Sequence, residues 1–183
     1  MPPVRVIGID PGSERTGWGV VDSDGRAYKL VNYGVIVSPP IDAFPKRLAK
    51  ISSNLETIFA EYQPQACAVE DAFFAVNVKT ALKLGQVRGA ILLTAERAAL
   101  EIGEYAPRLV KQSVVGYGAA EKGQVQEMVR ILLNLRVIPQ PNDASDALAI
   151  AICHINHAAA KAHVSRADAK ILAALTTKRR AAR

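Results

Sequence analysis

The first forty residues contain three extended segments separated by turn residues. Val4–Ile9 is mostly apolar and ends at residues 10–12 (Asp-Pro-Gly), which form a strong turn signal. Two further extended segments, residues 17–21 and 28–37, flank residues 23–25 (Ser-Asp-Gly), a sequence typical of a hairpin turn. We therefore predict three sequential strands in an antiparallel arrangement.

Apolar residues at helical spacing begin after the proline pair at residues 39–40. Residues 44–62 place them three or four positions apart, which predicts an amphipathic helix. Residues 78–100 are apolar on most of the helical circumference, so this helix needs cover from its own sheet, and a second subunit is a further candidate. Gly85 and Gly89, one turn apart within it, would allow another backbone to approach closely.

The rest of the chain alternates between short apolar runs and helical spacing. Two strands and three helices are expected, at residues 66–69, 101–105, 108–115, 122–134 and 143–161. The order of elements predicts an α/β fold with a mixed five-stranded sheet, whose first three strands are antiparallel and whose faces are flanked by helices.

Length and composition fit one globular domain. The chain has 183 residues, of which half are apolar and 22% are charged. No apolar run reaches the roughly 18 to 20 residues needed to span a bilayer, and the N-terminus lacks the layout of a signal peptide. We therefore expect a cytoplasmic protein without a membrane partner, in which Cys67 and Cys153 are buried thiols.

The net charge of +6 is concentrated at the C-terminal end. Residues 147–183 hold seven Lys or Arg and one acid, Asp168, whereas residues 1–146 hold 16 basic and 16 acidic residues. Such a segment is typical of proteins that bind a polyanion, but a solvated tail that only aids solubility is an equal alternative. We expect one domain over residues 1–163 and a flexible basic tail over residues 164–183.

Four acidic residues are placed to share one site. Asp10 and Glu70 each end an apolar strand, and the carboxyl ends of neighbouring strands in an open α/β sheet face one crevice. Asp143 and Asp146 lie three apart at the start of a helix and so share one face of it, although Asp143 could simply cap that helix. Since magnesium is held by a few carboxylates, the combination predicts a magnesium site.

Several sequence blocks resemble the RuvC family of Holliday junction resolvases. They follow the family order and spacing from about residue 4 to 155 and comprise residues 7–13, 16–17, 69–73, 81–89, 110–116, 120–122 and 143–151. The resemblance implies an RNase H-like fold, a homodimer, and metal-binding acids at Asp10, Glu70, Asp143 and Asp146.

The resemblance also implies an activity. The protein is expected to resolve four-way DNA junctions in recombination and repair by paired symmetric nicks, one from each subunit of a two-fold dimer. Two Mg²⁺ ions per site would activate the water and stabilise the leaving 3′ oxygen, which yields 5′-phosphate and 3′-hydroxyl ends. Mn²⁺ is an alternative because it also accepts all-oxygen sites, and the family implies cooperation with the RuvA–RuvB branch-migration complex.

Further residues match DNA-binding positions of the family. Lys111 and Lys122 correspond to phosphate contacts, and Phe73 lies where an aromatic ring can stack on an unpaired base. Core packing is the alternative role for Phe73, but Phe74 beside it can take that role. Some relatives carry a basic residue at 76–78, where this chain has Val-Asn-Val, so Lys79 is the candidate substitute.

Other functions agree less well with the sequence. The Asp-Pro-Gly turn also resembles the phosphate loop of actin-like kinases, but those proteins need a duplicated domain and this chain is too short. An RNase H-like nuclease acting on RNA precursors lacks the junction-family blocks, and a junction-binding protein without catalysis would not need all four acids. His154 and His157 lie two to three turns beyond the acids, so we expect packing or surface roles for them.

Overall fold

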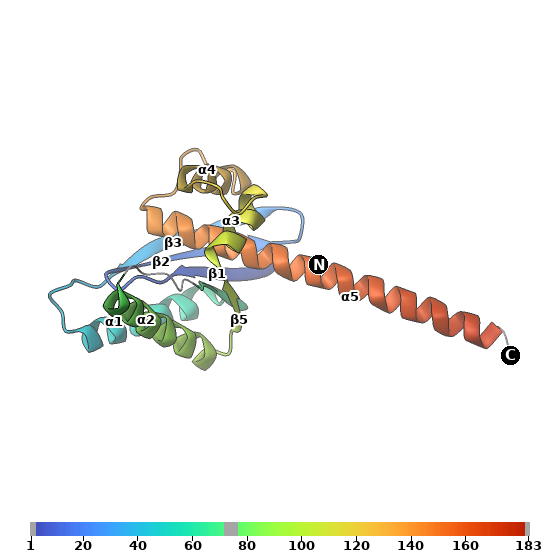
Figure 1. The fold of residues 1–183 in the computed structure, drawn as a ribbon, viewed down its shortest axis with the longest axis horizontal. Coiled ribbons are helices and arrows are strands. Elements are labelled where there is room, and N and C mark those ends of the chain that lie inside the picture. Colours follow the sequence, from blue (N-terminus) through green and yellow to red (C-terminus); the bar gives the residue numbers. More distant parts are fainter. Residues whose placement is uncertain (1–2, 72–76, 182–183) are drawn as a thin grey trace.

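The computed structural model describes residues 3–71 and 77–181, with side chains for 3–71 and 77–161. The strands are β1 Val4–Asp10, β2 Arg15–Ser23, β3 Tyr28–Val37, β4 Ala66–Glu70 and β5 Glu101–Tyr105. The helices are α1 Phe44–Tyr62, α2 Val78–Arg97, α3 Pro107–Val115, α4 Lys122–Leu132 and α5 Asn142–Ala181 (Figure 1).

The strands form one mixed sheet in the order β3-β2-β1-β4-β5. β1 pairs antiparallel with β2, and β2 pairs antiparallel with β3, through the turn predicted at residues 23–25. β4 lies parallel to β1 on its other side, and β5 lies parallel to β4. The predicted fold class is therefore confirmed, and β1 is the central strand.

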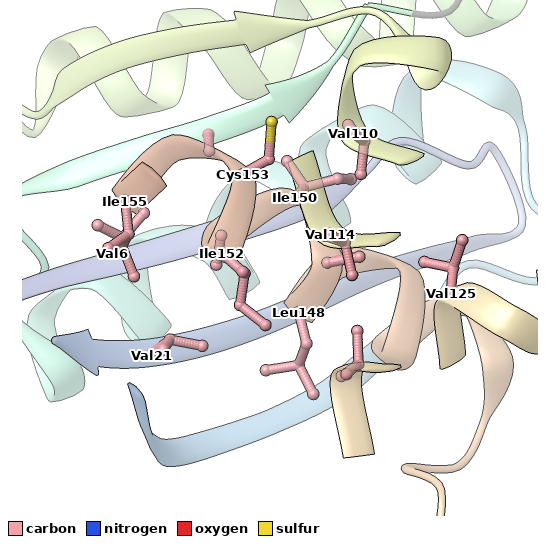
Figure 2. Packing of buried hydrophobic residues seen from close by; sticks show 14 of the residues in the cluster. Val6, Val21, Val110, Val114, Val125, Leu148, Ile150, Ile152, Cys153 and Ile155 are labelled. Carbon is pink, nitrogen blue, oxygen red and sulfur yellow. The ribbon is translucent and has the colours of Figure 1, made fainter. Parts of the chain in front are cut away.

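Helices cover both faces of the sheet (Figure 1). α1 and α2 pack on one face, where Ile7, Ile9 and Val69 belong to the same apolar cluster as Ile51 and Ile91. α3, α4 and the first half of α5 cover the other face. Figure 2 shows the second cluster there, with the side chains of α5 between the sheet and the two shorter helices.

Glycines let α5 lie directly on β1 and β2. A Cβ atom on Gly8 would be 2.0 Å from the Ala147 carbonyl oxygen, and one on Gly17 would be 2.0 Å from the Asp143 carbonyl oxygen. Contacts this short leave no room for a side chain on these strands. The first turns of α5 are therefore held against the strands at backbone distance, which fixes the position of the acids that these turns carry.

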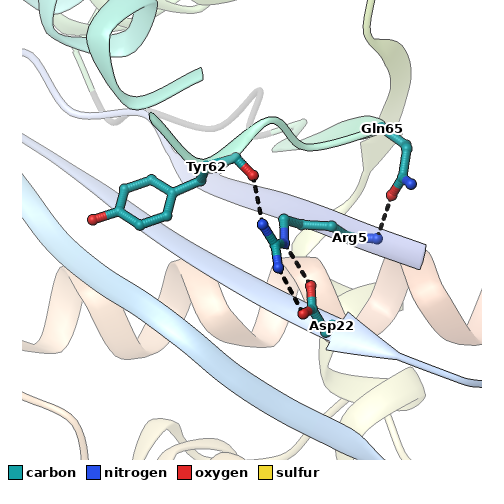
Figure 3. Close-up of polar contacts among 4 residues, drawn as sticks. All are labelled: Arg5, Asp22, Tyr62 and Gln65. Atoms are coloured by element: carbon teal, nitrogen blue, oxygen red, sulfur yellow. Dashed lines mark hydrogen bonds and ion pairs between the residues drawn. The ribbon is translucent and has the colours of Figure 1, made fainter. Parts of the chain in front are cut away.

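An ion pair closes the opposite end of the central strands. The Arg5 guanidinium donates to both carboxylate oxygens of Asp22 at 2.7 and 2.9 Å and to the Tyr62 carbonyl at 2.8 Å (Figure 3). The backbone N–H of the same arginine donates to the Gln65 side chain. One residue thus ties β1 to β2 and to the connection between α1 and β4.

Two helices differ from their predicted form. α5 is predicted over residues 143–161, where apolar periodicity is visible. In the structure it continues to Ala181 and extends away from the sheet (Figure 1). In α2 the residues Val78, Leu82 and Leu93 are 77, 64 and 58% exposed. Among the described residues, this chain therefore covers only the side of α2 that packs on the sheet and α1. In the described part of the chain, Cys67 and Cys153 are buried free thiols, as predicted, and no helix is long and apolar enough to cross a membrane.

Candidate active site

Strand alternation places two of the predicted acids on one face of the sheet. In β1, Ile7 and Ile9 face α1 and α2, so Val6, Gly8 and Asp10 face α5. In β4 the same alternation turns Ala66, Ala68 and Glu70 toward α5. Since the parallel register pairs Ile9 with Val69, the next residue on each strand is an acid, and the two acids are neighbours on the α5 side.

The other two acids come from the first turns of α5. The contact of Gly17 with the Asp143 backbone sets the start of this helix over the carboxyl end of β1. Asp143 accepts a hydrogen bond from Arg15 Nε at 2.8 Å and lies in the first turn of α5. Asp146 accepts from Lys122 Nζ at 2.5 Å. Both acids therefore have a cationic partner.

The four carboxylates influence one another electrostatically. The pKa of Asp10 is raised to about 7, mainly by burial and then by the nearby carboxylates of Glu70, Asp146 and Asp143, while Lys122 acts to lower it. Burial and then Asp146 also raise the pKa of Glu70, while Lys122 and Lys111 oppose this rise. The site is thus a concentration of negative charge that needs positive charge to balance it.

A cavity of about 200 Å³ opens at this point of the sheet. Its lining brings together three of the predicted acids and both predicted lysines of the family match. The polar lining residues are Asp10, Glu70, Lys111, Lys122 and Asp146. Asp143 is not in the lining, because its carboxylate turns toward Arg15.

The residues at this cavity suit a hard divalent cation in their chemistry. All four acids offer oxygen donors, and a cation beside Asp10 would favour the ionised carboxylate, which burial and the neighbouring acids disfavour. As they stand, no three Asp, Glu, His or Cys side chains within residues 3–71 and 77–161 are close enough together to hold a metal ion. The ion pairs with Arg15 and Lys122 account for part of this spacing, since they engage Asp143 and Asp146.

The remaining predicted residues do not line the cavity, or they fall outside the residues that the structure describes. Lys79 is exposed in the first turn of α2 and does not line the cavity. Phe73 and Phe74 fall outside the described residues. His154 is buried and lies 3.0 Å from the Tyr105 hydroxyl through Nδ1, and burial lowers its pKa, which confirms the packing role. His157 packs its ring against Tyr105.

Sequence reasoning missed several arginines around the acids. Arg15 binds Asp143, and Arg88 of α2 pairs with Asp71 at 2.8 Å and with Glu104, next to the end of β4. Arg47 is buried under the loop after β1 and donates to the Ser13 carbonyl. Only Arg88 lies in a family-like block, and the partners of all three are far away in the sequence, so spacing alone could not identify them.

Acids that gather on one face of a mixed sheet in this strand order are typical of RNase H-like nucleases. Comparison with known proteins gives the family. The family model described as crossover junction endodeoxyribonuclease RuvC matches residues 6–154. The enzymes of that name from Chloroflexus aggregans and Rubrobacter xylanophilus are 49% and 50% identical over 151 and 149 residues, which cover 82% and 81% of this chain and 92% and 83% of theirs.

Similar solved structures support the same family assignment. The Thermus thermophilus RuvC in complex with a Holliday junction substrate is 35% identical, with a TM-score of 0.83 over 86% of this chain and 96% of that one. The yeast mitochondrial Holliday junction resolvase Ydc2 shares the fold at 15% identity, with a TM-score of 0.62 over 84% of this chain and 78% of that one. The chain belongs to the RuvC family of crossover junction endodeoxyribonucleases, which are divalent-metal-dependent nucleases.

The raised pKa of Asp10 predicts an unusual pH dependence of stability in EDTA. The folded protein keeps this proton up to about pH 7, whereas the unfolded chain releases it near 3.8, so the free energy of unfolding falls as pH rises between these values. Asp10→Asn removes the cost of ionising this carboxyl in the folded protein. The variant should therefore be more stable than the unmodified protein at pH 8, by at most about 4 kcal/mol.

The measurement is urea unfolding of both proteins at pH 5, 6, 7 and 8. The difference in free energy of unfolding should grow as pH rises. A difference that stays constant across this range would show that Asp10 is not held in a repulsive environment.

Proposed function

We propose that this protein resolves Holliday junctions in recombination and repair by paired symmetric hydrolysis of phosphodiester bonds. The observation that carries the proposal is the half-buried Asp10 carboxylate at the end of β1, whose pKa is raised by burial and by three acids from β4 and α5. Membership of the RuvC family and the likeness to a relative solved with a junction support this substrate. Hydrolysis would leave 5′-phosphate and 3′-hydroxyl ends, which a ligase can reseal.

The four acids are the proposed metal ligands. Mg²⁺, two ions per site with Mn²⁺ as an alternative, would supply the Lewis-acid stabilisation of the phosphate and of the attacking and leaving oxygens. Asp10 is central to the group and is proposed to serve both ions. Glu70 would complete the shell of one ion, and Asp143 with Asp146 that of the other.

Lys111 and Lys122 are proposed to hold the DNA backbone at the cavity. Both line it, and both lower the pKa of Glu70 through their charge. Lys122 is 57% exposed and already donates to Asp146, so its ammonium can turn to a phosphate when that carboxylate binds a cation. A cation beside the scissile phosphate offsets charge that develops there.

A homodimer is proposed to use the exposed side of α2. Val78, Leu82, Gly85, Gly89 and Leu93 follow one another at helical spacing, and their side chains or open glycine positions face away from this chain's core. An exposed apolar stripe of this kind is typical of an interface. Two-fold symmetry would give each of two equivalent DNA strands its own active site.

Other predictions remain proposals. Phe73 is proposed to stack on an unpaired base, and Lys79, exposed at the start of α2, is proposed to contact the backbone. Residues 1–163 are proposed as the nuclease domain and residues 164–183 as a basic C-terminal tail, for which binding of a polyanion and a role in solubility alone are equal alternatives. A bacterial enzyme of this kind would work in the cytoplasm, with a RuvA–RuvB complex as partner.

Glu70→Gln tests the active site. The amide keeps the size of the side chain but removes a negative ligand, so cleavage of a four-way junction should fall by about 10³-fold, since a metal contributes several kcal/mol to catalysis. Junction affinity should stay within about twofold, because binding rests on phosphate contacts. Glu56→Gln, an exposed acid on α1, is the matched control and should cleave normally. Cleavage by the Glu70 variant at the control's rate would refute the assignment.

Leu82→Glu tests the dimer. A charge buried in an apolar interface should raise the dissociation constant of the dimer at least about tenfold, measured by sedimentation equilibrium. Ile131→Glu on α4 is the control, because Ile131 is 53% exposed on a different helix. If both variants dimerise like the unmodified protein, the interface is not on this side of α2.

A further inference from the structure

Arg15 lies beside the acids and pairs with Asp143, but the proposed function gives it no role. Arg15 begins β2 and shares a face with Gly17, because alternate residues of a strand point the same way. This face meets α5, since a Cβ atom on Gly17 would be 2.0 Å from the Asp143 carbonyl oxygen. This geometry turns the Arg15 side chain along the start of α5. Its Nε donates to Asp143 Oδ2 at 2.8 Å.

The backbone that carries Arg15 is held from several sides. The Thr16 hydroxyl, fully buried, donates to the Gly12 carbonyl at 2.8 Å, and the Ser38 N–H donates to the Glu14 carbonyl at 2.8 Å. The buried Arg47 side chain donates to the Ser13 carbonyl. The backbone at Arg15 is therefore already ordered. Binding of a ligand by this side chain loses little additional conformational entropy in the loop.

The contact between Arg15 and Asp143 uses one donor of the guanidinium and one oxygen of the carboxylate. A guanidinium has five N–H donors in a planar fork, and the Nε–H bond to Asp143 leaves the terminal amino groups without a hydrogen-bond partner among the described residues. The side chain is 47% exposed. Asp143 in turn keeps Oδ1 for a metal, so the ion pair is compatible with its proposed role.

Lys111 and Lys122 reach the acids from α3 and α4, whereas Arg15 reaches them from β2. A strand whose phosphate lies at the four acids must continue past the cavity, where its next phosphates need balancing charge. Guanidinium groups suit this task because their fork matches two phosphate oxygens.

We propose that Arg15, oriented by Asp143, is a DNA-binding residue of the active site that contacts a backbone phosphate adjacent to the one that is cut. This inference rests on the proposed junction substrate. Asp143 fixes the plane of the guanidinium through Nε, and the terminal amino groups donate to the phosphate.

The test compares Arg15→Gln with Arg26→Gln in equilibrium binding to a four-way junction in EDTA. Arg26 is an exposed arginine in the hairpin at the far end of β2, so both variants lose one charge from the same strand pair. Arg15→Gln should lower affinity about 3- to 10-fold and reduce the slope of log affinity against log salt by about one, whereas Arg26→Gln should change neither.

A second measurement uses the unmodified protein and so does not depend on the folding of a variant. Junction should slow the modification of Arg15 by phenylglyoxal, followed by peptide mass spectrometry, and leave that of Arg26 unchanged. Equal binding by the two variants, or equal modification of Arg15 with and without junction, would overturn the inference. If the unmodified protein does not bind the junction at all, it is the proposed function that fails instead.

Discussion

The direct packing of the α5 backbone on the two central strands is the constraint on which the rest of the structure depends. Gly8 and Gly17 remove the side chains that would otherwise separate helix from sheet. At ordinary helix–sheet spacing, the acids of α5 would lie several ångströms further from Asp10. The same glycines therefore serve the core and the site: one contact buries the apolar face of α5 and brings its first turns to the end of β1.

That proximity has an electrostatic cost, which the surrounding cations partly offset. Asp10 is half-buried beside three other carboxylates, and burial together with their charge raises its pKa to about 7. Lys122 binds Asp146 and Arg15 binds Asp143, so the two acids of α5 are each neutralised by a different element. Sites that concentrate like charge in this way are typical of function rather than of stability. A divalent cation would relieve the repulsion more effectively than a side chain can.

Much of this arrangement follows from local sequence patterns. The mostly apolar run Val4–Ile9 and the turn after it predict both the strand and the position of Asp10, and Glu70 follows in the same way. Strand parity then places both acids on the α5 face, since alternation is a property of the backbone. The five-stranded mixed sheet was predictable because its elements are short, regular and separated by clear turns.

Other parts depend on contacts between residues far apart in the chain. Arg15 meets Asp143 across 128 positions, and no spacing rule relates them. The exposure of Leu82 was also not predictable. Apolar periodicity predicts that a helix face is buried but does not identify the element or subunit that buries it. The full length of α5 was also not predicted: the sequence pattern indicated a helix that ends at residue 161, whereas the helix continues to Ala181 and extends away from the sheet.

The central claim is that the convergent acids form a junction-specific nuclease site. The most direct measurement incubates the protein with a mobile four-way junction, a plain duplex and an RNA–DNA hybrid, each with Mg²⁺ and with EDTA, and maps the cuts on denaturing gels. We predict paired nicks at symmetric positions in two opposing strands of the junction, only with Mg²⁺, and intact duplex and hybrid. Cleavage of the hybrid in preference to the junction, or unpaired cuts in the plain duplex, would contradict the account.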